Sequence, residues 1–347
     1  MASSAQGPQG DTPVSLMPLI AGYMPSRVVH VSAQLGIADL LADGPKTADT
    51  LAWETSTHAA SLRRLLRALA SIGLVEEIEP SRFSLTATGA QLRSNVPGSM
   101  RNLALMFGGE RAWRSWGELL HSVRTGESAT RHVFGVGSFE YLAANPEQAV
   151  IFNEAMAELT RQVTQALISN YDFSRFRKLI DVGGGNGAMI AALVGATPDL
   201  HGVVFDLPSG SAEASRKLAD AHVEARCEVV TGDFFREVPK GADAYILKSV
   251  IHDWNDDESH AILKNCRIAM HEKSTLLLVE RIMPEVMELS LNQQRMAMID
   301  INMLAMPGGQ ERSEAEYRAL LANAGFVLTQ VKPLPGLDFS LIEAVPQ

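Results

Sequence analysis

Apolar residues in the first half of the chain recur at helical spacing. In residues 58–74, HAASLRRLLRALASIGL, they fall on one face at steps of three and four, and Gly73 follows as a C-terminal cap. The members of this face are Leu62, Leu65, Leu66, Leu69 and Ile72. Residues 74–89, LVEEIEPSRFSLTATG, are typical of two short strands around a Pro-Ser turn. Helix and hairpin together predict a winged-helix unit over about residues 34–94.

A long helix is predicted over residues 145–171, NPEQAVIFNEAMAELTRQVTQALISNY. Asn145 is placed to cap its N-terminus and Pro146 to occupy its first turn. Apolar residues then recur along one face at Phe152, Met156, Leu159, Val163 and Leu167. We expect this helix to connect two domains.

From about residue 177 the pattern changes to short apolar runs separated by helical stretches. The runs are KLIDVGGG, GVVFDLP, CEVVTGDFF, AYILKSV and TLLLVER, and two further strands are expected in VLTQV and FSLIEAV. This alternation indicates a parallel sheet covered on both faces. A helical insertion, residues 291–306, and a helix beginning with a Ser313–Glu316 capping box interrupt the series.

These patterns predict three segments. A disordered lead-in is expected over residues 1–15, and a helical and winged-helix domain over residues 16–170. A doubly wound, Rossmann-like α/β domain is expected over residues 171–347. A chain of 347 residues is long enough for two such domains.

Charge and cysteine content limit the kinds of binding partner and the cellular location that are expected. Lys and Arg total 30 against 40 Asp and Glu, a net charge of -10, which disfavours a nucleic-acid partner. Arg63, Arg64 and Arg67 therefore read as a solvated helix face. Cys227 and Cys266 form no short-spaced motif, which favours a reducing, cytoplasmic location. The first fifteen residues lack signal-peptide features and no run of eighteen apolar residues follows, so no membrane partner is expected.

The glycine turn DVGGGNG, residues 181–187, ends a predicted strand and opens a helix. Gly183, Gly185 and Ala188 match the dinucleotide pattern, yet that match is weak by itself. Three aspartates at successive strand ends decide between NAD and S-adenosylmethionine. Asp181 would repel a pyrophosphate but can hold an ammonium group, and Asp206 is placed for ribose hydroxyls. Asp233 can accept from an adenine amino group while Phe234 packs on the ring, so the set favours S-adenosylmethionine.

Several motifs of the chain together resemble those of a known enzyme family. LIDVGGGNG, FDLP, GDFF, LKSVIHDW, LLLVE and MPGGQERSEAEY occur in the order and spacing of S-adenosylmethionine-dependent O-methyltransferases. That family includes the plant caffeate and flavonoid enzymes and bacterial tailoring enzymes of the carminomycin O-methyltransferase type. The resemblance covers nearly the whole chain and implies that the winged-helix segment is a dimerisation domain, so a homodimer is expected. It also implies that Lys248 and Trp254 line the cofactor site.

His252 is the candidate general base. Phenols with a pKa near 10 are mostly protonated at neutral pH, and histidine, with an ordinary pKa near 6.5, can accept their proton. A carboxylate on the other ring nitrogen would fix the tautomer, and Glu280 and Glu311 match the family's carboxylates beside the catalytic histidine. The acidic residues after His252 fit the start of a helix better than a metal site. We therefore expect a metal-independent enzyme.

The resemblance places the acceptor site between the connecting helix and the insertion before GGQER. The residues that these segments supply are Phe152, Met156, Asn302, Met303 and Met306. A methionine-rich lining adapts to flat, apolar ligands, and the Asn302 amide can orient a hydroxyl or carbonyl group. The substrate class expected is a small aromatic or polyketide-like metabolite of secondary metabolism, as in antibiotic biosynthesis.

Two alternatives remain open at this point. The first is N-methylation of a heteroaromatic such as a phenazine, for which a base matters less. The second is a non-enzymatic, cofactor-sensing winged-helix DNA regulator, which the acidic net charge opposes. More distant relatives keep the fold but catalyse decarboxylation or hydroxylation, and the presence of His252, Glu280 and Glu311 argues against those reactions.

Overall fold

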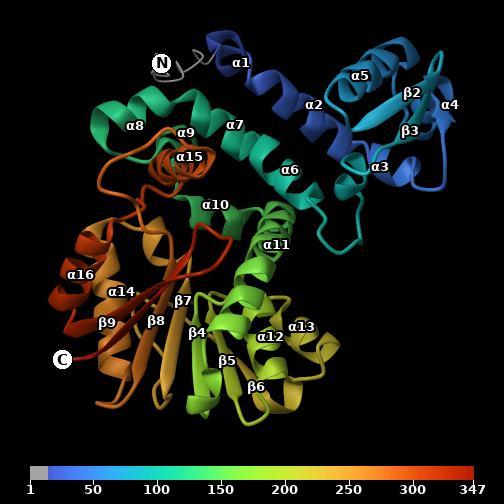
Figure 1. Ribbon diagram of the computed structural model, residues 1–347. Coiled ribbons are helices and arrows are strands. Elements are labelled where there is room, and N and C mark those ends of the chain that lie inside the picture. Colours follow the sequence, from blue (N-terminus) through green and yellow to red (C-terminus); the bar gives the residue numbers. More distant parts are fainter. Residues whose placement is uncertain (1–14) are drawn as a thin grey trace, which may run out of the picture. The chain divides into compact units, whose positions relative to one another are not determined.

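The computed structural model describes residues 15–347, so the predicted lead-in, apart from Ser15, lies outside the described residues. The chain divides into two compact units, the first ending at Gly108 and the second beginning at Gly109 (Figure 1). The border predicted near residue 170 stays a prediction of the sequence; the units divide earlier because helices before it pack with the second unit. No helix formed by the described part of the chain is both long and apolar enough to cross a bilayer.

The first unit is helical with one small antiparallel sheet. Its helices are α1 (Leu16–Ile20), α2 (Tyr23–Gln34), α3 (Ile37–Leu40), α4 (Ala48–Glu54), α5 (Ala59–Ser71) and α6 (Arg101–Gly108), with a 3-10 turn, η1 (Gly89–Leu92). Its strands β1 (Lys46–Thr47), β2 (Val75–Glu79) and β3 (Arg82–Leu85) pair in the order β1-β3-β2. The helix-and-hairpin prediction is confirmed, with the turn at Pro80 and Ser81.

Helix α5 shows why this unit folds. Leu62, Leu66 and Leu69 recur at steps of four and three and are buried in its core. Ile72, predicted to share that face, is 40% exposed because it lies beyond the last helical turn. The chain then reverses at Gly73, whose φ of 78° is the left-handed conformation that glycine adopts without strain.

The second unit contains a seven-stranded, mostly parallel sheet. The strands are β4 (Lys178–Val182), β5 (His201–Asp206), β6 (Cys227–Thr231), β7 (Ala244–Lys248), β8 (Thr275–Glu280), β9 (Phe326–Pro333) and β10 (Ser340–Pro346). Their order is β6-β5-β4-β7-β8-β10-β9, in which β4 to β8 run parallel and β9 and β10 are antiparallel. Each predicted strand is present, and the Rossmann-like fold class is confirmed.

Helices cover both faces of this sheet (Figure 1). One face packs against α14 (Asp256–Ala269) and α16 (Glu314–Asn323), and the other packs against α11 (Pro146–Asn170), α12 (Ala188–Ala196) and α13 (Ala214–Asp220). Successive residues of β7 face opposite sides, so Tyr245 and Leu247 join one core and Ala244 and Ile246 the other. Because both faces are buried, the strand is a continuous apolar run.

The connecting helix α11 begins at Pro146, as predicted. Asn145 occupies the N-cap position, but its side chain makes no capping bond and donates instead to the carbonyl of Tyr141. Val163 and Leu167 are buried against the sheet, whereas Leu159 is 39% exposed. The remaining helices of this unit are α7 (Glu110–Gly117), α8 (Leu119–Thr125), α9 (Ala129–Phe134), α10 (Ser138–Ala144) and α15 (Leu291–Ala305), and the 3-10 turns are η2 (Phe173–Arg175), η3 (Glu224–Arg226) and η4 (Ile251–Asp253).

Candidate active site

The candidate site lies at the carboxyl edge of the parallel strands. Asp206, Lys248 and Glu280 are the last residues of β5, β7 and β8, and Asp181 is the last but one of β4. Neighbouring parallel strands end on the same side of a sheet, so the topology brings these four ionisable groups to one edge. His252 follows β7 in the short turn η4, directly above that edge.

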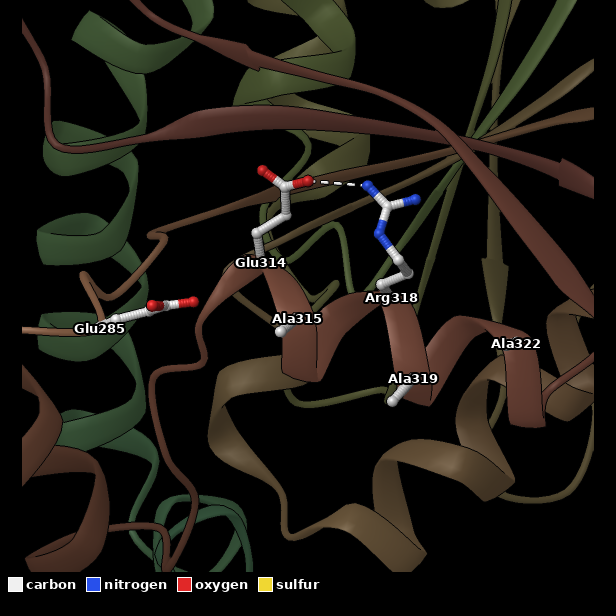
Figure 2. A pocket seen from close by; sticks show the side chains of 6 residues that line it. All are labelled: Glu285, Glu314, Ala315, Arg318, Ala319 and Ala322. Atoms are coloured by element: carbon white, nitrogen blue, oxygen red, sulfur yellow. Dashed lines mark hydrogen bonds and ion pairs between the residues drawn. The ribbon is translucent and has the colours of Figure 1, made fainter.

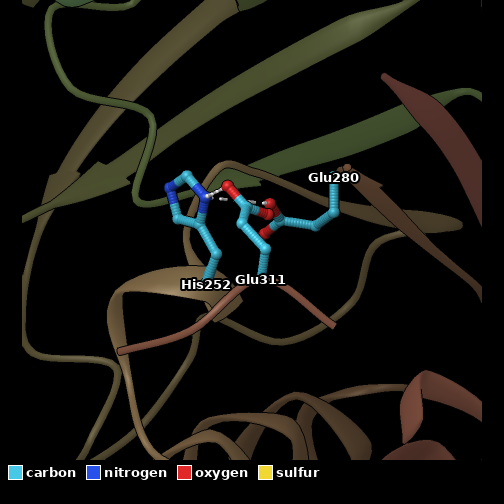
Figure 3. A group of neighbouring side chains, drawn as sticks. All are labelled: His252, Glu280 and Glu311. Carbon is cyan, nitrogen blue, oxygen red and sulfur yellow. Dashed lines mark hydrogen bonds and ion pairs between the residues drawn. The ribbon is translucent and has the colours of Figure 1, made fainter. Parts of the chain in front are cut away.

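His252 faces two buried carboxyl groups (Figure 3). Its Nδ1 lies 2.8 Å from Oε1 of Glu311 and 3.7 Å from Oε2 of Glu280. The Oε1 of Glu280 accepts the backbone N–H groups of Val250 and Ile251 at 3.0 and 2.9 Å. Glu280 therefore holds the start of the turn that carries His252, and Glu311 contacts the ring itself. The structure thus brings together the three residues that the sequence predicted for catalysis.

The other ring nitrogen faces a third carboxyl group. Asp253 Oδ1 lies 3.7 Å from Nε2 of His252, and the Asp253 side chain is 18% exposed. Since Nδ1 is engaged by Glu311, Nε2 is the nitrogen left for a substrate. Sequence reasoning assigned Asp253 only to a helix start, and its position next to the histidine was the available signal for a larger role.

This carboxyl cluster governs the charge of His252. Burial would lower the pKa of the imidazole, but Glu311, Glu280 and Asp253 outweigh it and raise that pKa to about 9. Burial raises the pKa of Glu280 to about 7. Burial would also raise the pKa of Glu311, but His252 and Arg281 hold it below its ordinary value. The pair is therefore an imidazolium and a carboxylate at neutral pH, because each charge stabilises the other.

Two arginines missed by the sequence analysis hold this arrangement. Arg312 is fully buried and donates to the carbonyls of Ile251 and Trp254, at 3.0 and 2.8 Å, on either side of His252. Its charge is paired with Asp256 at 2.8 Å. Arg281 Nη1 lies 3.4 Å from Oε1 of Glu311. Both follow residues singled out for catalysis, and adjacency was the only sequence signal.

A helix of the insertion also fixes Glu311. Asp300 of α15 accepts the backbone N–H of Glu311 through Oδ1 at 2.8 Å. This bond ties the loop that carries the carboxylate to the insertion helix. Nothing in the spacing of Asp300 and Glu311 distinguishes this pair from other acidic residues, so the sequence gives no signal for it.

His252, Glu280 and Glu311 also satisfy the geometry of a metal site. Each offers one ligand atom, and these atoms lie within 4.8 Å of one another. Imidazole and carboxylate are ligands that Zn²⁺ accepts. The direct hydrogen bond between His252 and Glu311 uses the same nitrogen and oxygen atoms that a metal would need. A metal ion and the His252–Glu311 hydrogen bond would therefore compete for the same side chains.

The glycine turn after β4 presents an unsatisfied carboxyl oxygen. Asp181 is 1% exposed, and its Oδ2 has no hydrogen-bond partner among the described residues. Gly185 has φ 56°, and no atom lies within 4 Å of the position that a Cβ would occupy, so the turn borders open space. Burial and the nearby Asp206 raise the pKa of Asp181 to about 8. An ammonium group would supply the missing partner, so these residues fit the amino-acid end of S-adenosylmethionine.

Three other residues predicted to bind the cofactor, Asp206, Asp233 and Lys248, each form hydrogen bonds within the protein. Asp206 accepts the N–H groups of Gly185 and Leu207 at 2.7 and 2.6 Å, so it holds the glycine turn. Asp233 Oδ1 accepts the N–H of Phe235 at 2.9 Å, which makes it a turn residue in this structure. Lys248 donates to Thr160 at 3.1 Å, and burial lowers the pKa of its ammonium to about 8.

Aromatic rings form a wall beside His252. The Trp254 ring centre lies 6.0 Å from that of Phe234 and 5.5 Å from that of Phe139 on α10. Phe139 in turn meets Phe152 of α11 edge-on at 6.4 Å. This chain of contacts brings Phe152, predicted to bind the acceptor, into one cluster with Trp254, predicted to bind the cofactor.

The other four residues predicted to bind the acceptor differ in burial and in hydrogen bonding. Asn302 accepts the indole N–H of Trp116 at 3.0 Å. Met156 and Met303 are half-buried, but Met306 is 6% exposed and its carbonyl accepts the hydroxyls of two serines. Met306 therefore packs within the protein, and its predicted binding role rests on the sequence alone.

A surface hollow of about 520 Å³ lies elsewhere, along α16 (Figure 2). Its lining consists of Glu285, Glu314, Ala315, Arg318, Ala319 and Ala322. The only charged pair drawn there is Glu314 with Arg318, an exposed i,i+4 ion pair at 2.7 Å. Exposed pairs of this kind are common on helices. The hollow lacks the buried ionisable groups of the strand edge, which is the candidate active site.

Comparisons with known proteins identify the family of the chain. Residues 116–327 match the O-methyltransferase domain family and residues 17–94 match the O-methyltransferase dimerisation domain family. The chain is 43% identical to a phenazine O-methyltransferase of Lysobacter antibioticus over 97% of this chain and 98% of that protein. It is 41% identical to the O-demethylpuromycin-O-methyltransferase of Streptomyces alboniger over 95% and 88% of the two chains.

A solved structure extends these similarities to ligands. An O-methyltransferase from neocarzinostatin biosynthesis, in complex with S-adenosylmethionine and 2-hydroxy-5-methyl naphthoic acid, is similar with a TM-score of 0.84 and 31% identity. The match covers 97% of this chain and all of that one.

Proposed function

The chain belongs to the S-adenosylmethionine-dependent O-methyltransferases with an N-terminal dimerisation domain, and we propose that it methylates a phenolic or enolic hydroxyl of a small aromatic or polyketide-like metabolite, with His252 as the general base. The family places the reaction in secondary metabolism, as in antibiotic biosynthesis. The DNA-regulator alternative is not proposed, because family membership identifies an enzyme. The observation that carries the proposal is the 2.8 Å contact between His252 Nδ1 and Glu311.

The cofactor is S-adenosylmethionine, which when bound supplies a methyl group on a positively charged sulfur. We assign its amino-acid end to Asp181 and the glycine turn at Gly183 and Gly185, where the unpaired carboxyl oxygen lies. Asp206, Asp233, Phe234, Lys248 and Trp254 are proposed to hold the rest of the cofactor, as the sequence predicted. Asp206 and Asp233 already accept backbone N–H groups, so each can offer only its remaining lone pairs.

His252 is proposed to remove the acceptor proton. The hydroxyl proton passes to Nε2. Nδ1 keeps its own proton and forms a hydrogen bond through it to Glu311. Arg281 holds Glu311 in its carboxylate form, and Glu280 anchors the turn through two backbone N–H groups. The imidazolium that results is stabilised by three carboxyl groups, and the acceptor oxygen is left with the electron pair needed for methylation.

The raised pKa of His252 refines this role. Before the acceptor binds, the ring carries both protons at neutral pH. Turnover then requires either that the Nε2 proton leaves first or that the acceptor arrives as a phenolate. In the first route Nε2 then takes the acceptor proton, whereas in the second route no proton is taken, so only the first route depends on His252 as a base. No step here calls for a Lewis acid, so we propose a metal-independent reaction.

The acceptor is proposed to lie against the aromatic wall. Phe152, Met156, Asn302, Met303 and Met306 are the residues that the sequence predicted for it. Phe152 is supported by the ring contacts that lead through Phe139 to Trp254. The other four depend on position in α11 and α15.

We also propose a homodimer acting in the cytoplasm, without nucleic acid or membrane as partners. The matched dimerisation domain supports the homodimer. Helix α1 exposes Leu16, Met17, Leu19 and Ile20 to between 58% and 65%, an apolar surface that a second copy would cover. Light scattering on the purified protein tests the dimer directly.

The enzymatic proposal is tested with methyl-labelled S-adenosylmethionine and a panel of phenols, quinones, polyketides and phenazines. Label should enter the organic extract with wild type, and His252→Ala should reduce transfer by about a hundredfold or more. His201→Ala is the matched control, because this exposed histidine starts β5 at the opposite edge of the sheet. Equal transfer by wild type and His252→Ala would reject the base and favour an N-acceptor such as a phenazine.

A further inference from the structure

Arg111 is a buried cation that no mechanism above uses. It lies on α7, and its side chain is 9% exposed. Among residues 15–347 no carboxylate lies within ion-pair distance of its guanidinium, and no acceptor forms a hydrogen bond with it. A buried, unpaired charge costs several kcal/mol in principle, so proteins rarely retain one without a partner. No residue in the described part of the chain therefore pairs with this cation, and its guanidinium nitrogens are absent from the fully buried unpaired atoms, so they keep some contact with solvent.

The surroundings of Arg111 point to the active site. Its guanidinium carbon lies 5.7 Å from the ring centre of Phe152, which belongs to the aromatic wall. Burial lowers the pKa of Arg111, and the electrostatic effects of Tyr141 and then of Asp253 oppose that lowering. Asp253 in turn lies 3.7 Å from Nε2 of His252, the nitrogen that faces the acceptor. Arg111 thus stands on the substrate side of the base.

The carboxyl groups around His252 explain why a negatively charged acceptor would need a cation such as Arg111 beside it. Asp253, Glu280 and Glu311 surround His252, and within residues 15–347 only Glu311 has a second cation within 4.0 Å, Arg281. A negatively charged acceptor approaching Nε2 would meet this carboxyl cluster and be repelled. A guanidinium on the same side offers two parallel N–H donors to a carboxylate and neutralises the added charge.

We propose, on the basis of the methyltransferase function above, that Arg111 binds an anionic oxygen of the acceptor, so that the preferred substrate is a hydroxylated aromatic carboxylic acid. Its ring lies along Phe152, its carboxylate pairs with Arg111, and its hydroxyl faces Nε2 of His252. Arg111 is therefore a specificity-determining residue, and the wall residue Phe152 holds the guanidinium in place by stacking.

The test compares acids with their uncharged analogues. Dissociation constants are measured by calorimetry, with S-adenosylhomocysteine present, for 1-hydroxy-2-naphthoic acid, hydroxybenzoic acids and the corresponding carboxamides. Wild type, Arg111→Leu, Arg111→Lys and Arg114→Leu are compared. Arg114 is the matched control, because it lies one turn along the same helix, is half exposed and already pairs with Glu110 at 3.1 Å.

Wild type should bind at least one acid about tenfold or more tightly than its carboxamide, the size of a charge-assisted hydrogen bond. Arg111→Leu should abolish that preference by weakening only the acid, Arg111→Lys should recover part of it, and Arg114→Leu should behave as wild type. Thermal unfolding of Arg111→Leu should occur at the same temperature as wild type or higher, since the variant removes a largely buried charge that no residue of 15–347 pairs with.

Three results would overturn the proposal. The first is equal binding of acid and carboxamide by wild type, and the second is no binding of any acid in the set. The third is an Arg111→Leu variant that binds both ligands more weakly and unfolds at a lower temperature, as loss of a purely structural arginine would cause. These outcomes are separate from the methyltransferase proposal. Transfer of label to neutral phenols with no acid preference would retain the function and reject the role of Arg111, whereas binding of acids without transfer would do the reverse.

Discussion

Gly309 lies directly against the backbone of His252. A Cβ on residue 309 would come within 2.1 Å of the His252 carbonyl oxygen and 2.3 Å of the Asp253 carbonyl carbon. The next residue, Gln310, donates its N–H to the same carbonyl at 2.9 Å. Two backbone segments that are far apart in sequence therefore touch at a position where any side chain would separate them, two residues before Glu311.

Gly309→Ala should accordingly damage both activity and stability. The added methyl group must push the loop away from His252, which lengthens the Glu311 contact, and misplacement of this size costs about a hundredfold in rate. Overpacking should also destabilise the fold by about 1–3 kcal/mol. Initial rates and thermal unfolding measure the two effects. Gly117→Ala is the control, since no atom lies within 4 Å of its Cβ position; equal behaviour of the two variants would contradict the close-contact explanation.

Glu311→Gln should reduce the turnover number by about 10²–10⁴-fold, the range seen when a histidine base loses its orienting carboxylate. The amide keeps the shape of the side chain but no longer stabilises the imidazolium, and it leaves Arg281 without one of its acceptors. Glu314→Gln, three residues away on the surface, should stay within about twofold of wild type. Binding of S-adenosylhomocysteine should be the same for all three proteins, because Glu311 is not assigned to the cofactor.

The rate should depend on pH through His252. Its pKa of about 9 means that the unprotonated base is the minor form at pH 7 and grows as pH rises, so kcat/KM should increase up to about pH 9. Glu280 has a pKa of about 7 and is an anion over most of that range, where it raises the pKa of His252. Glu280→Gln should therefore shift the rise to lower pH. The measurement requires an acceptor whose reacting hydroxyl does not ionise below about pH 10, and an unshifted profile would exclude this coupling.

Much of the fold was accessible from the sequence because it depends on local pattern. The seven strands of the second unit and the capping box at Ser313 follow from apolar runs and short-range polar signals. Asn145 is the N-cap residue as predicted, although its side chain makes no capping bond, and the prediction that Ile72 shares the buried face was wrong. A helix face ends with the last turn, and a side chain that could cap a helix can also bond backward to Tyr141.

The residues of the site also fall into those that the sequence could predict and those that it could not. Asp181, Lys248 and Glu280 could be placed at one edge because parallel strands end together. Arg111, Arg281, Asp300 and Arg312 could not, because each acts through contacts between segments far apart in the chain. A sequence pattern shows the periodicity of one helix or strand. It does not show which side chains of another helix or strand will contact it.

Removal of metal should leave the activity unchanged, and added Zn²⁺ should inhibit. His252, Glu280 and Glu311 present ligand atoms within 4.8 Å of one another, so the site can accept a cation. A cation there would compete for Nδ1 of His252 and for Oε1 of Glu311, which now bond to each other at 2.8 Å, and would thereby remove the group that stabilises the imidazolium. Activity is measured after dialysis against EDTA and then during titration with Zn²⁺ and, as a control, with Mg²⁺, which binds imidazole poorly. Loss of activity on chelation that Zn²⁺ restores would mean that the cluster is a metal centre, and it would replace the histidine base with a metal-assisted reaction.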